Sequence, residues 1–426
     1  MGTLDASSVI RGLRTSRGAA DPYPLYAAAR AAGPILRDAT YTLVTTFADA
    51  DQVLRDPGFT AAPQTGYAQA AKVVRTPPHP LHPPHPLHPP HPPRPAGAAV
   101  SVLRANGADH ARMRKVLSPP FQRRRLGQLR PMIEQCARDL LDPGLVDAGR
   151  AFEFMDALGY ELPIAVICEL LGVPRAERRR MRAAARARTI FLEPFPSADE
   201  LEAAAAAHTE IFELFGPLVR AHRTEPRDDL LSELLRSVAA DGLAADGLTE
   251  AELFANLSLL LIAGFETTAG LLGNAVALLL GHEGMAEAVH ADPERIPAFV
   301  AEALRHDPPV QLVTRTAAQQ DAVIGGVPVA PGNLVMVLLG SAARDPERYR
   351  DPDEFAPFTR PPSQSLAFGA GAHYCLGAGL ARLEAEVLLR ELVRGRTRLV
   401  ADGPGLRPAG RIAIRSFSSL PVRVAG

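Results

Sequence analysis

The chain has 426 residues, 46 basic Lys and Arg side chains against 47 acidic ones, and a formal net charge of -1. This balance argues against binding to nucleic acid or to an anionic membrane. Hydrophobic residues make up 47% and charged residues 22%, which is typical of a soluble globular chain with a large core. Cys136, Cys168 and Cys375 are odd in number and lack CxxC spacing, which argues against a disulfide framework and a structural zinc site.

The N-terminal region and the overall composition predict a cytoplasmic protein. The first thirty residues hold no long apolar run, so we expect neither a signal peptide nor a membrane anchor there. Arginine replaces lysine almost everywhere except at Lys72 and Lys115, which suggests the codon bias of a GC-rich bacterium. No composition break resembles a linker, so residues 1–426 are predicted to form a single domain.

The segment 77–95 reads PPHPLHPPHPLHPPHPPRP and is the low-complexity stretch of the chain. Its prolines exclude helix and sheet. Histidines recur at every third residue from His79 to His91, so a polyproline II helix would align them in one stripe. A metal-binding or ligand-gating stripe is one interpretation. We favour the other, a mobile surface loop produced by repeat expansion.

The second half of the chain is predicted to be mainly helical. Apolar residues recur three and four positions apart, and they predict helices at Met132–Leu141, Ala165–Leu171, Leu201–Phe215 and Phe299–Arg305. Strand-like alternation is sparse, and it predicts strands at Tyr41–Thr46, Ala322–Val329, Leu334–Leu339 and Arg411–Val424. The predicted fold class is therefore mainly α with small β-sheets.

The longest predicted helix follows Thr249, which forms a capping-box pair with Glu252, and continues without proline to Gly281. A helix this long and apolar is either a membrane span or the buried axis of a large domain. Several polar residues interrupt it: Asn256, Glu266, Thr267, Thr268 and Asn274. They favour the buried axis. The acid and the hydroxyls are then either satisfied core groups or a proton-handling site.

Glycines surround one cysteine in the stretch LAFGAGAHYCLGAGLAR, from Leu366 to Arg382, just before an amphipathic helix predicted to end at Gly395. The dipole and the free N–H groups of a helix N-terminus stabilise a thiolate and lower its pKa. Gly369, Gly371 and Gly377 remove side chains where N–H groups would approach the sulfur. The pattern predicts that the cysteine is a nucleophile or a metal ligand.

Four motifs together identify a family resemblance. The glycine-rich loop contains Phe368, Gly371, His373, Cys375 and Gly377. Before it stand AGFETT at Ala263–Thr268, an ExxR pair at Glu302 and Arg305, and DPDEFAPFTR ending at Arg360. In this order they resemble the cytochromes P450, the haem-thiolate monooxygenases. Looser similarity extends to Asp21–Tyr26 and Asp109–Arg114, and the resemblance covers the chain except about 62–97.

The resemblance implies the cytochrome P450 fold, with haem b buried between the long helix and the cysteine loop. Cys375 would be the thiolate ligand of the iron, and Phe368 would shield its sulfur. Backbone N–H groups near Gly377 would tune the reduction potential. The family's propionate-binding positions fall on four basic residues: His110, Arg114, Arg315 and His373.

The ExxR pair is implied to be structural. Glu302 and Arg305 stand three residues apart on one helix face, and in the family a later arginine joins them. Arg360 is the residue we expect in that place. The resulting network would hold the haem loop in shape.

Glu266 and Thr267 match the family's acid–alcohol pair in the long helix. Activation of dioxygen needs protons, so a hydroxyl near the oxygen and an acid that relays protons suit the task. Ala263 and Gly264 lack bulk, so they would let the helix approach the haem. Peroxide-dependent members usually lack the pair, so its presence favours oxygen activation with electrons from a reductase chain.

Electrons are expected from separate proteins, a ferredoxin and a ferredoxin reductase, because no flavin or iron–sulfur segment is visible. The basic run Arg123–Arg125 lies on the family's proximal docking face and could attract an acidic ferredoxin, or it could be a solvated turn. The run Arg175–Arg188 predicts a solvated helix face rather than a nucleic-acid site.

The predicted substrate is a mainly apolar small molecule of bacterial secondary metabolism. By analogy, the pocket would be lined by Leu259, Ile262, Ala263, Val310–Val313 and Phe417. The predicted protein is a cytoplasmic enzyme, monomeric, that hydroxylates or epoxidises this molecule. Two alternatives stay open, namely a cytochrome P450 that catalyses oxidative coupling or ring closure, and a non-catalytic haem- or metal-binding protein.

Overall fold

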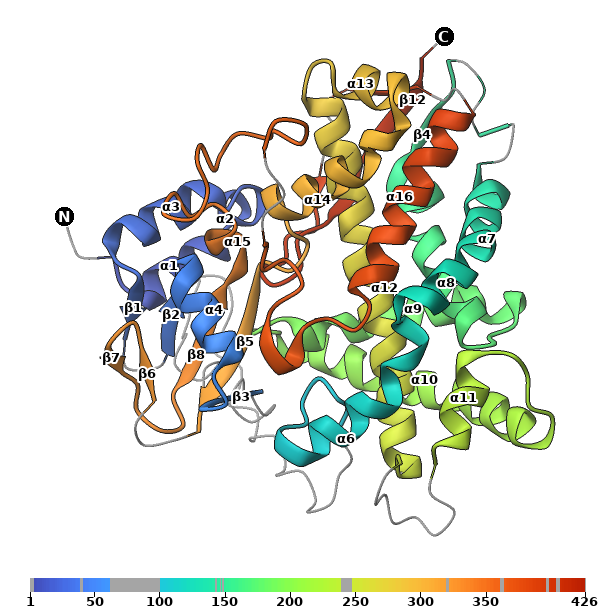
Figure 1. The fold of residues 1–426 in the computed structure, drawn as a ribbon, viewed down its shortest axis with the longest axis horizontal. Coiled ribbons are helices and arrows are strands. Elements are labelled where there is room, and N and C mark those ends of the chain that lie inside the picture. The colour runs from blue at the N-terminus through green and yellow to red at the C-terminus, as the bar shows by residue number, and fades with distance from the viewer. Residues whose placement is uncertain are drawn as a thin grey trace.

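The computed structural model describes residues 4–38, 41–61, 100–141, 144–145, 147, 149–238, 247–318, 322–360, 364–395, 398–403 and 407–425. The predicted His-Pro loop at 77–95 lies outside these residues. Figure 1 shows a smaller β-rich part, coloured mostly blue and orange, beside a larger helical part. The described chain is mostly helical with small sheets, which confirms the predicted fold class.

Most helices belong to the larger part. The α-helices are α1 (Ala6–Leu13), α2 (Ser16–Ala20), α3 (Tyr23–Ala32), α4 (Phe47–Arg55), α6 (Gly107–Leu117), α7 (Arg123–Leu140), α8 (Glu161–Leu170), α9 (Arg178–Arg188), α10 (Ala198–Thr224), α11 (Leu230–Arg236), α12 (Glu250–Gly281), α13 (Met285–Ala291), α14 (Ile296–His306), α15 (Leu339–Ala342) and α16 (Ala378–Arg394). Short helical turns of other types are η1 (Pro119–Phe121), η2 (Met155–Gly159), η3 (Arg175–Glu177), η4 (Thr189–Leu192), η5 (Pro293–Arg295) and η6 (Gly371–His373). The four helices predicted from periodicity lie within α7, α8, α10 and α14, apart from one residue at the end of α7 and one at the end of α8.

The largest sheet has five strands in the order β1-β2-β8-β5-β3. Its strands are β1 (Ile35–Arg37), β2 (Tyr41–Val44), β3 (Phe59–Ala61), β5 (Leu312–Ala317) and β8 (Leu334–Leu338). The pair β2 and β8 is parallel, and the other neighbouring pairs are antiparallel. Every residue of β8 is buried, so the middle of this sheet belongs to the core.

Three smaller sheets complete the described β structure. Their strands are β4 (Ala151–Glu153), β6 (Val323–Ile324), β7 (Val327–Pro328), β9 (Leu399–Ala401), β10 (Arg407–Pro408), β11 (Phe417–Ser419) and β12 (Pro421–Val424). They pair as β4-β12-β9, β10-β11 and β6-β7. All four predicted strand regions contain strands, whereas β5 was not predicted, because its sequence LVTRTA mixes polar and apolar residues and its ladder depends on the distant β8 and β3.

Helix α12 is the axis of the larger part and runs beside α16 (Figure 1). The predicted capping box begins it: the Glu252 N–H donates to Thr249 Oγ1 at 3.2 Å, and the Thr249 N–H donates to Glu252 Oε2 at 2.9 Å. Its length and composition would suit a membrane span, yet 72% of its apolar window is buried inside the protein. The helix is thus a buried core element, as the sequence predicted.

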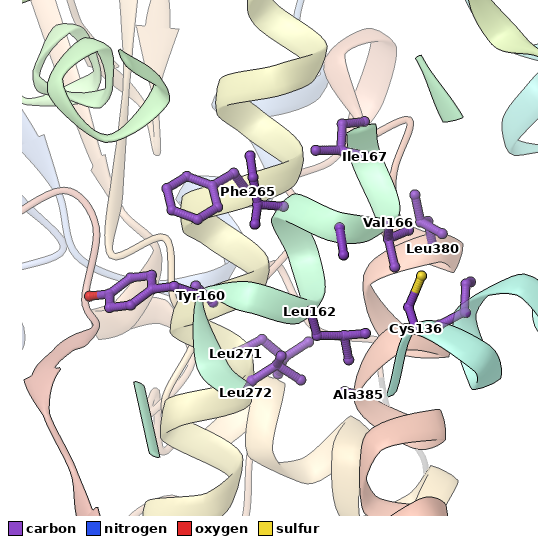
Figure 2. Close-up of a cluster of buried hydrophobic side chains, with 14 of the residues drawn as sticks. Cys136, Tyr160, Leu162, Val166, Ile167, Phe265, Leu271, Leu272, Leu380 and Ala385 are labelled. Carbon is purple, nitrogen blue, oxygen red and sulfur yellow. The ribbon is translucent and has the colours of Figure 1, made fainter. Parts of the chain in front are cut away.

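Side chains from four helices meet in the largest core, as Figure 2 shows. Cys136 comes from α7, Val166 from α8, Phe265 from α12 and Leu380 from α16. Complete burial of a large apolar side chain contributes about 1.5–3 kcal/mol. This packing holds the N-terminal end of α16, and therefore the cysteine loop before it, close to the middle of α12.

Candidate active site

A cavity of about 320 Å³ lies between the middle of α12, strand β5 and the cysteine loop. It brings together ten of the residues predicted for the site: His110, Arg114, Ala263, Gly264, Thr267, Arg315, Phe368, His373, Cys375 and Gly377. Glu266 and Gly371 do not line it. His110 and Cys375, 265 positions apart in the sequence, thus share one site.

Cys375 lies between the turn η6 and the start of α16. Its backbone N–H donates to the carbonyl of Phe368 at 3.0 Å, which folds the loop back on itself. The thiol is exposed to the cavity, although protein surrounds it on the other sides. Burial raises the pKa of the Cys375 thiol, while the backbone N–H groups of Gly377 and Ala378 act in the opposite direction. The helix N-terminus therefore offers the sulfur the donors that a thiolate needs.

The two other cysteines are inert by comparison. Cys136 and Cys168 are buried in the apolar core, where burial raises the pKa of their thiols to about 11 and about 12. Cys375 is consequently the cysteine suited to bind a ligand.

Gly371 has a packing role. Its backbone has φ +67°, and a Cβ atom there would lie 2.4 Å from the carbonyl oxygen of Leu54 in α4. The sequence suggested that this glycine clears space around the sulfur. The structure instead places it against α4, where the absent side chain lets the loop dock.

Four basic side chains gather at one end of the cavity: His110, Arg114, Arg315 and His373. The imidazole rings of His110 and His373 have centroids 4.2 Å apart, and Arg114 Nη2 donates to the carbonyl of Tyr374 at 2.6 Å. Burial, the Arg315 charge and the neighbouring basic groups lower the pKa of His373 to about 3. Two arginine charges beside two imidazole rings suit a ligand that brings carboxylates.

The lining fits the haem group implied by the resemblance. A thiol stands on one wall, small residues of α12 stand on another, apolar side chains fill most of the rest, and basic donors occupy one end. An iron porphyrin needs this combination, because its ring is apolar, its iron takes a soft thiolate and its two carboxylates need cationic partners. Cys375 would ligate the iron, and the four basic residues would hold the carboxylates.

Glu266 and Thr267 point to different surroundings. Thr267 lines the cavity, and its Oγ1 donates to the carbonyl of Ala263 at 2.6 Å. Glu266 is 2% exposed, lies behind the cavity wall, and has an Oε2 atom without a hydrogen-bond partner. Burial raises the pKa of its carboxyl, although the charge of Arg411 acts in the opposite direction. The pair therefore consists of a hydroxyl in the cavity and a protonatable acid behind it.

The ExxR network forms as the sequence predicted. Arg305 Nη2 donates to Glu302 Oε1 at 2.6 Å, Arg305 Nε donates to Glu302 Oε2 at 3.0 Å, and Arg360 Nε donates to Glu302 Oε1 at 3.0 Å. Arg305 also donates to the carbonyls of Pro352 and Glu354. Glu302 and Arg305 are buried, so the network joins α14 to the segment before the cysteine loop.

The cavity lining differs from the predicted one at three positions. Of the predicted residues, Leu259, Ala263, Val310, Leu312 and Val313 line it, whereas Ile262, Gln311 and Phe417 do not. Phe417 packs against Gly273 of α12 instead, and its carbonyl accepts the Tyr160 hydroxyl at 2.9 Å. Ala413 and Ile414 provide the wall in its place. The strand pattern of the C-terminal segment gave no register, so it could not identify the lining residue.

Sequence reasoning missed Glu193, which holds this C-terminal wall. Its carboxylate accepts the backbone N–H groups of Ile412, Ala413 and Ile414 at 3.1–3.2 Å. Burial raises the pKa of Glu193, while the three N–H groups act in the opposite direction. This cluster of bonds, here called the Glu193 clamp, ties the turn after α9 to the segment that lines the cavity. No local pattern marks it in the sequence.

The two basic runs are partly neutralised. Arg123 and Arg124 are exposed, whereas Arg125 forms ion pairs with Asp228 and Glu233, each at 3.4 Å. Most of the second run is the predicted solvated face. Arg178, Arg182 and Arg188 are corrections to that prediction, because all three are half-buried.

Comparisons with known proteins agree with this geometry. The family "Cytochrome P450" matches residues 95–395. Cytochrome P450 monooxygenase PikC of Streptomyces venezuelae is 34% identical over 414 residues, which cover 95% of this chain and 91% of PikC. 6-Deoxyerythronolide B hydroxylase of Saccharopolyspora erythraea is 38% identical over 322 residues, or 74% of this chain and 76% of that protein.

A solved structure supports the same assignment. The ligand-free crystal structure of CYP164A2 from Mycobacterium smegmatis superposes with a TM-score of 0.85 at 33% identity, covering 98% of this chain and 100% of that one. Sequence, fold and site thus agree along nearly the whole described chain. The protein is a haem-thiolate monooxygenase that belongs to the cytochrome P450 family.

Proposed function

We propose that this enzyme inserts one oxygen atom of dioxygen into a C–H bond or an alkene of a mainly apolar small molecule of bacterial secondary metabolism. In the proposal it works in the cytoplasm and receives electrons from a ferredoxin and its reductase. One observation carries it: the Thr267 hydroxyl and the Cys375 thiol face the same cavity, with the buried acid Glu266 adjacent to Thr267. The names of two relatives, a monooxygenase and a hydroxylase, support it.

The haem, when bound, supplies the oxygen chemistry, and the protein supplies protons and orientation. Thr267 can turn its hydroxyl from the Ala263 carbonyl into the cavity, which presents a proton at Oγ1. Glu266 can replace that proton, because burial favours its protonated form. Apolar residues such as Leu259 and Val313 exclude water and hold an apolar substrate.

The first test is spectroscopic and isotopic. Haem-loaded enzyme should show a thiolate-type reduced carbon monoxide band. It should incorporate ¹⁸O from ¹⁸O₂ into product when it is supplied with ferredoxin, reductase and NADPH. The substrates tested would be a panel of apolar polyketides, terpenoids and aromatics. Product that forms without the label would favour oxidative coupling or ring closure, and would overturn oxygen insertion.

The second test addresses the proton path. Thr267→Ala and Glu266→Gln should bind haem normally but lose about 10²–10⁴-fold in product formation. They should release hydrogen peroxide instead, because oxygen reduction is no longer coupled to substrate oxidation. Thr268→Ala is the matched control, since Thr268 also lines the cavity and is adjacent in sequence. Unchanged coupling in both test variants would contradict the proposed roles.

A further inference from the structure

Arg188 is a half-buried cation with two buried nitrogens that have no hydrogen-bond partner. These two nitrogens are Nε and Nη1. The guanidinium carbon lies 3.6 Å from the centroid of the Phe191 ring, which removes one face of the group from water. Burial, together with the positive charge of Arg104, lowers the pKa of Arg188 to about 10. A buried charge without an anionic partner is costly, so its presence calls for an explanation.

Two other basic residues, Arg104 and His208, lie near Arg188. Arg104 lines the cavity and places its charge near Arg188. His208 of α10 has a buried Nδ1 atom without a partner, and burial together with the Arg188 charge lowers the pKa of its imidazole. We call Arg104, Arg188 and His208 the distal basic cluster. The charges that shift the pKa of Arg188 and His208 are all positive.

The distal basic cluster reaches the cavity through Arg104, whereas Arg188 and His208 are not lining residues. Leu192 follows Arg188 by one helical turn and lines the cavity, as Arg104 does. Helices α9, α10 and α12 pack on one another at this point (Figure 1). Aromatic rings connect His208 to α12: the ring centroids of His208 and Phe212 lie 4.5 Å apart in an edge-to-face contact, and those of Phe212 and Phe254 lie 5.1 Å apart in a stacked one. These neighbours of His208 are apolar.

The acids nearest in sequence to His208 and Arg188 have other partners, since Glu210 pairs with Arg180 at 3.4 Å. Glu193 is already engaged by three backbone N–H groups in the Glu193 clamp. Other arginines of α9 have partners of their own, since Arg178 binds Glu169 and Arg182 binds Asp156 and Glu161. Arg188 differs from them in having two buried nitrogens left without a partner. Within the part of the chain that the structure describes, no acid accepts a hydrogen bond from Arg188 Nε or Nη1, so a ligand in the cavity can supply the anion.

We propose that the distal basic cluster binds a carboxylate at one end of an otherwise apolar substrate. This inference rests on the proposed function, whose substrate class it narrows from apolar molecules to apolar carboxylic acids. A guanidinium holds a carboxylate by charge-assisted hydrogen bonds, and burial strengthens them. The carboxylate would supply the missing partners of Arg188, while the rest of the substrate extends along the apolar lining toward the cysteine loop.

The test compares matched ligands on the haem-loaded full chain. Dodecanoate and 2-naphthylacetate would each be measured by calorimetry against a neutral partner of the same skeleton, 1-dodecanol and methyl 2-naphthylacetate. We expect at least one acid to bind tenfold or more tightly than its partner. In Arg188→Met, which keeps length and contact with Phe191, this preference should disappear, and in Arg188→Lys it should partly remain. Dodecyl phosphate serves to compare a phosphate with a carboxylate.

A second readout does not need a ligand. Replacing Arg188, whose two buried nitrogens have no partner, by Met should raise the Tm of the ligand-free protein by about 2 °C, whereas loss of a structural arginine would lower it. Arg182→Met is the matched control on the same helix and should not change the acid preference. The proposal is overturned if neither acid binds more tightly than its neutral partner, if the preference survives Arg188→Met, or if dodecyl phosphate binds more tightly than dodecanoate.

Failure of the two proposals can be told apart. Calorimetry reports binding without turnover, whereas the carbon monoxide band and ¹⁸O incorporation report the haem chemistry. If the parent enzyme shows no preference for the acids but incorporates ¹⁸O normally, only the proposed carboxylate site is contradicted. If the parent enzyme prefers the acids but incorporates no ¹⁸O into product, only the proposed oxygen insertion is contradicted.

Discussion

Two arginines, Arg305 and Arg188, have contrasting surroundings. Arg305 is buried and donates to Glu302 and to backbone carbonyls. Arg188, at the end of α9, is half-buried and keeps two buried nitrogens without partners. A buried charge whose partners are all within the protein holds the fold together, and one that lacks them is available to a ligand. The contrast separates a structural arginine from a ligand-binding one.

Among the predicted effects, we expect the largest from the replacement of Cys375. Cys375→Ala removes the thiol that faces the cavity, so the thiolate-type reduced carbon monoxide band should disappear altogether. Cys136→Ala is the control, since that cysteine is buried in the core away from the cavity and the band should persist. A thiolate-type band in Cys375→Ala would show that another group ligates the iron.

The next effect tests the contrast directly. Arg305→Met removes one of the two arginines that pair with the buried carboxylate of Glu302, which should cost about 3–5 kcal/mol in the free energy of unfolding. Arg188→Met strands no partner and should not destabilise the protein. Urea denaturation of both variants measures the difference. Arg390→Met, which removes an exposed ion pair with Glu294, serves as a surface control and should change little. Equal losses of unfolding free energy in Arg305→Met and Arg188→Met would contradict the distinction between a structural and a ligand-binding arginine.

Glu384 offers a smaller effect that depends on pH. This residue of α16 lines the cavity, is 2% exposed, and has an Oε2 atom without a partner. Burial raises the pKa of its carboxyl well above the ordinary value. A carboxyl group whose pKa is higher in the folded state than in the unfolded state stabilises the fold at low pH. This contribution is complete below the unfolded-state pKa, and it is lost as the pH rises through the folded-state pKa. Glu384→Gln should therefore gain stability relative to the parent protein as pH rises.

The measurement is the Tm of both proteins between pH 5 and pH 8. The Tm difference should widen with pH by about 2–4 °C. Glu386→Gln is the control on the same helix, because burial raises the pKa of Glu386 as well but the charge of Arg130 opposes the shift. Its Tm difference should widen less. A constant difference for Glu384→Gln would mean that the carboxyl finds a partner in solution.

The sequence predicted the features that are encoded locally. The capping box of α12, the cysteine loop and the Glu302–Arg305 pair each depend on residues within a few positions, so their spacing carries the information. Arg360 was also predicted, because the family resemblance supplied the distant partner. These features form or support the part of the site around Cys375.

The features missed are made by contacts between distant segments. Arg188 looked like another solvated residue of a basic helix, and only the packing of α9 and α10 buries it. Phe417 looked like a lining residue, but the path of the C-terminal segment places Ala413 and Ile414 there instead. Local periodicity carries no information on such contacts, because burial and register depend on tertiary packing.

The Glu193 clamp has a consequence for biosynthesis. Its carboxylate lies near the middle of the chain, and the three N–H groups that it binds are about 220 residues later. During synthesis, the Glu193 carboxylate therefore lacks these partners until residues 412–414 have left the ribosome. Contacts of such long sequence separation form late and slowly. The part of the cavity wall formed by Ala413 and Ile414 would therefore assemble late, and chains that end before these residues would lack it.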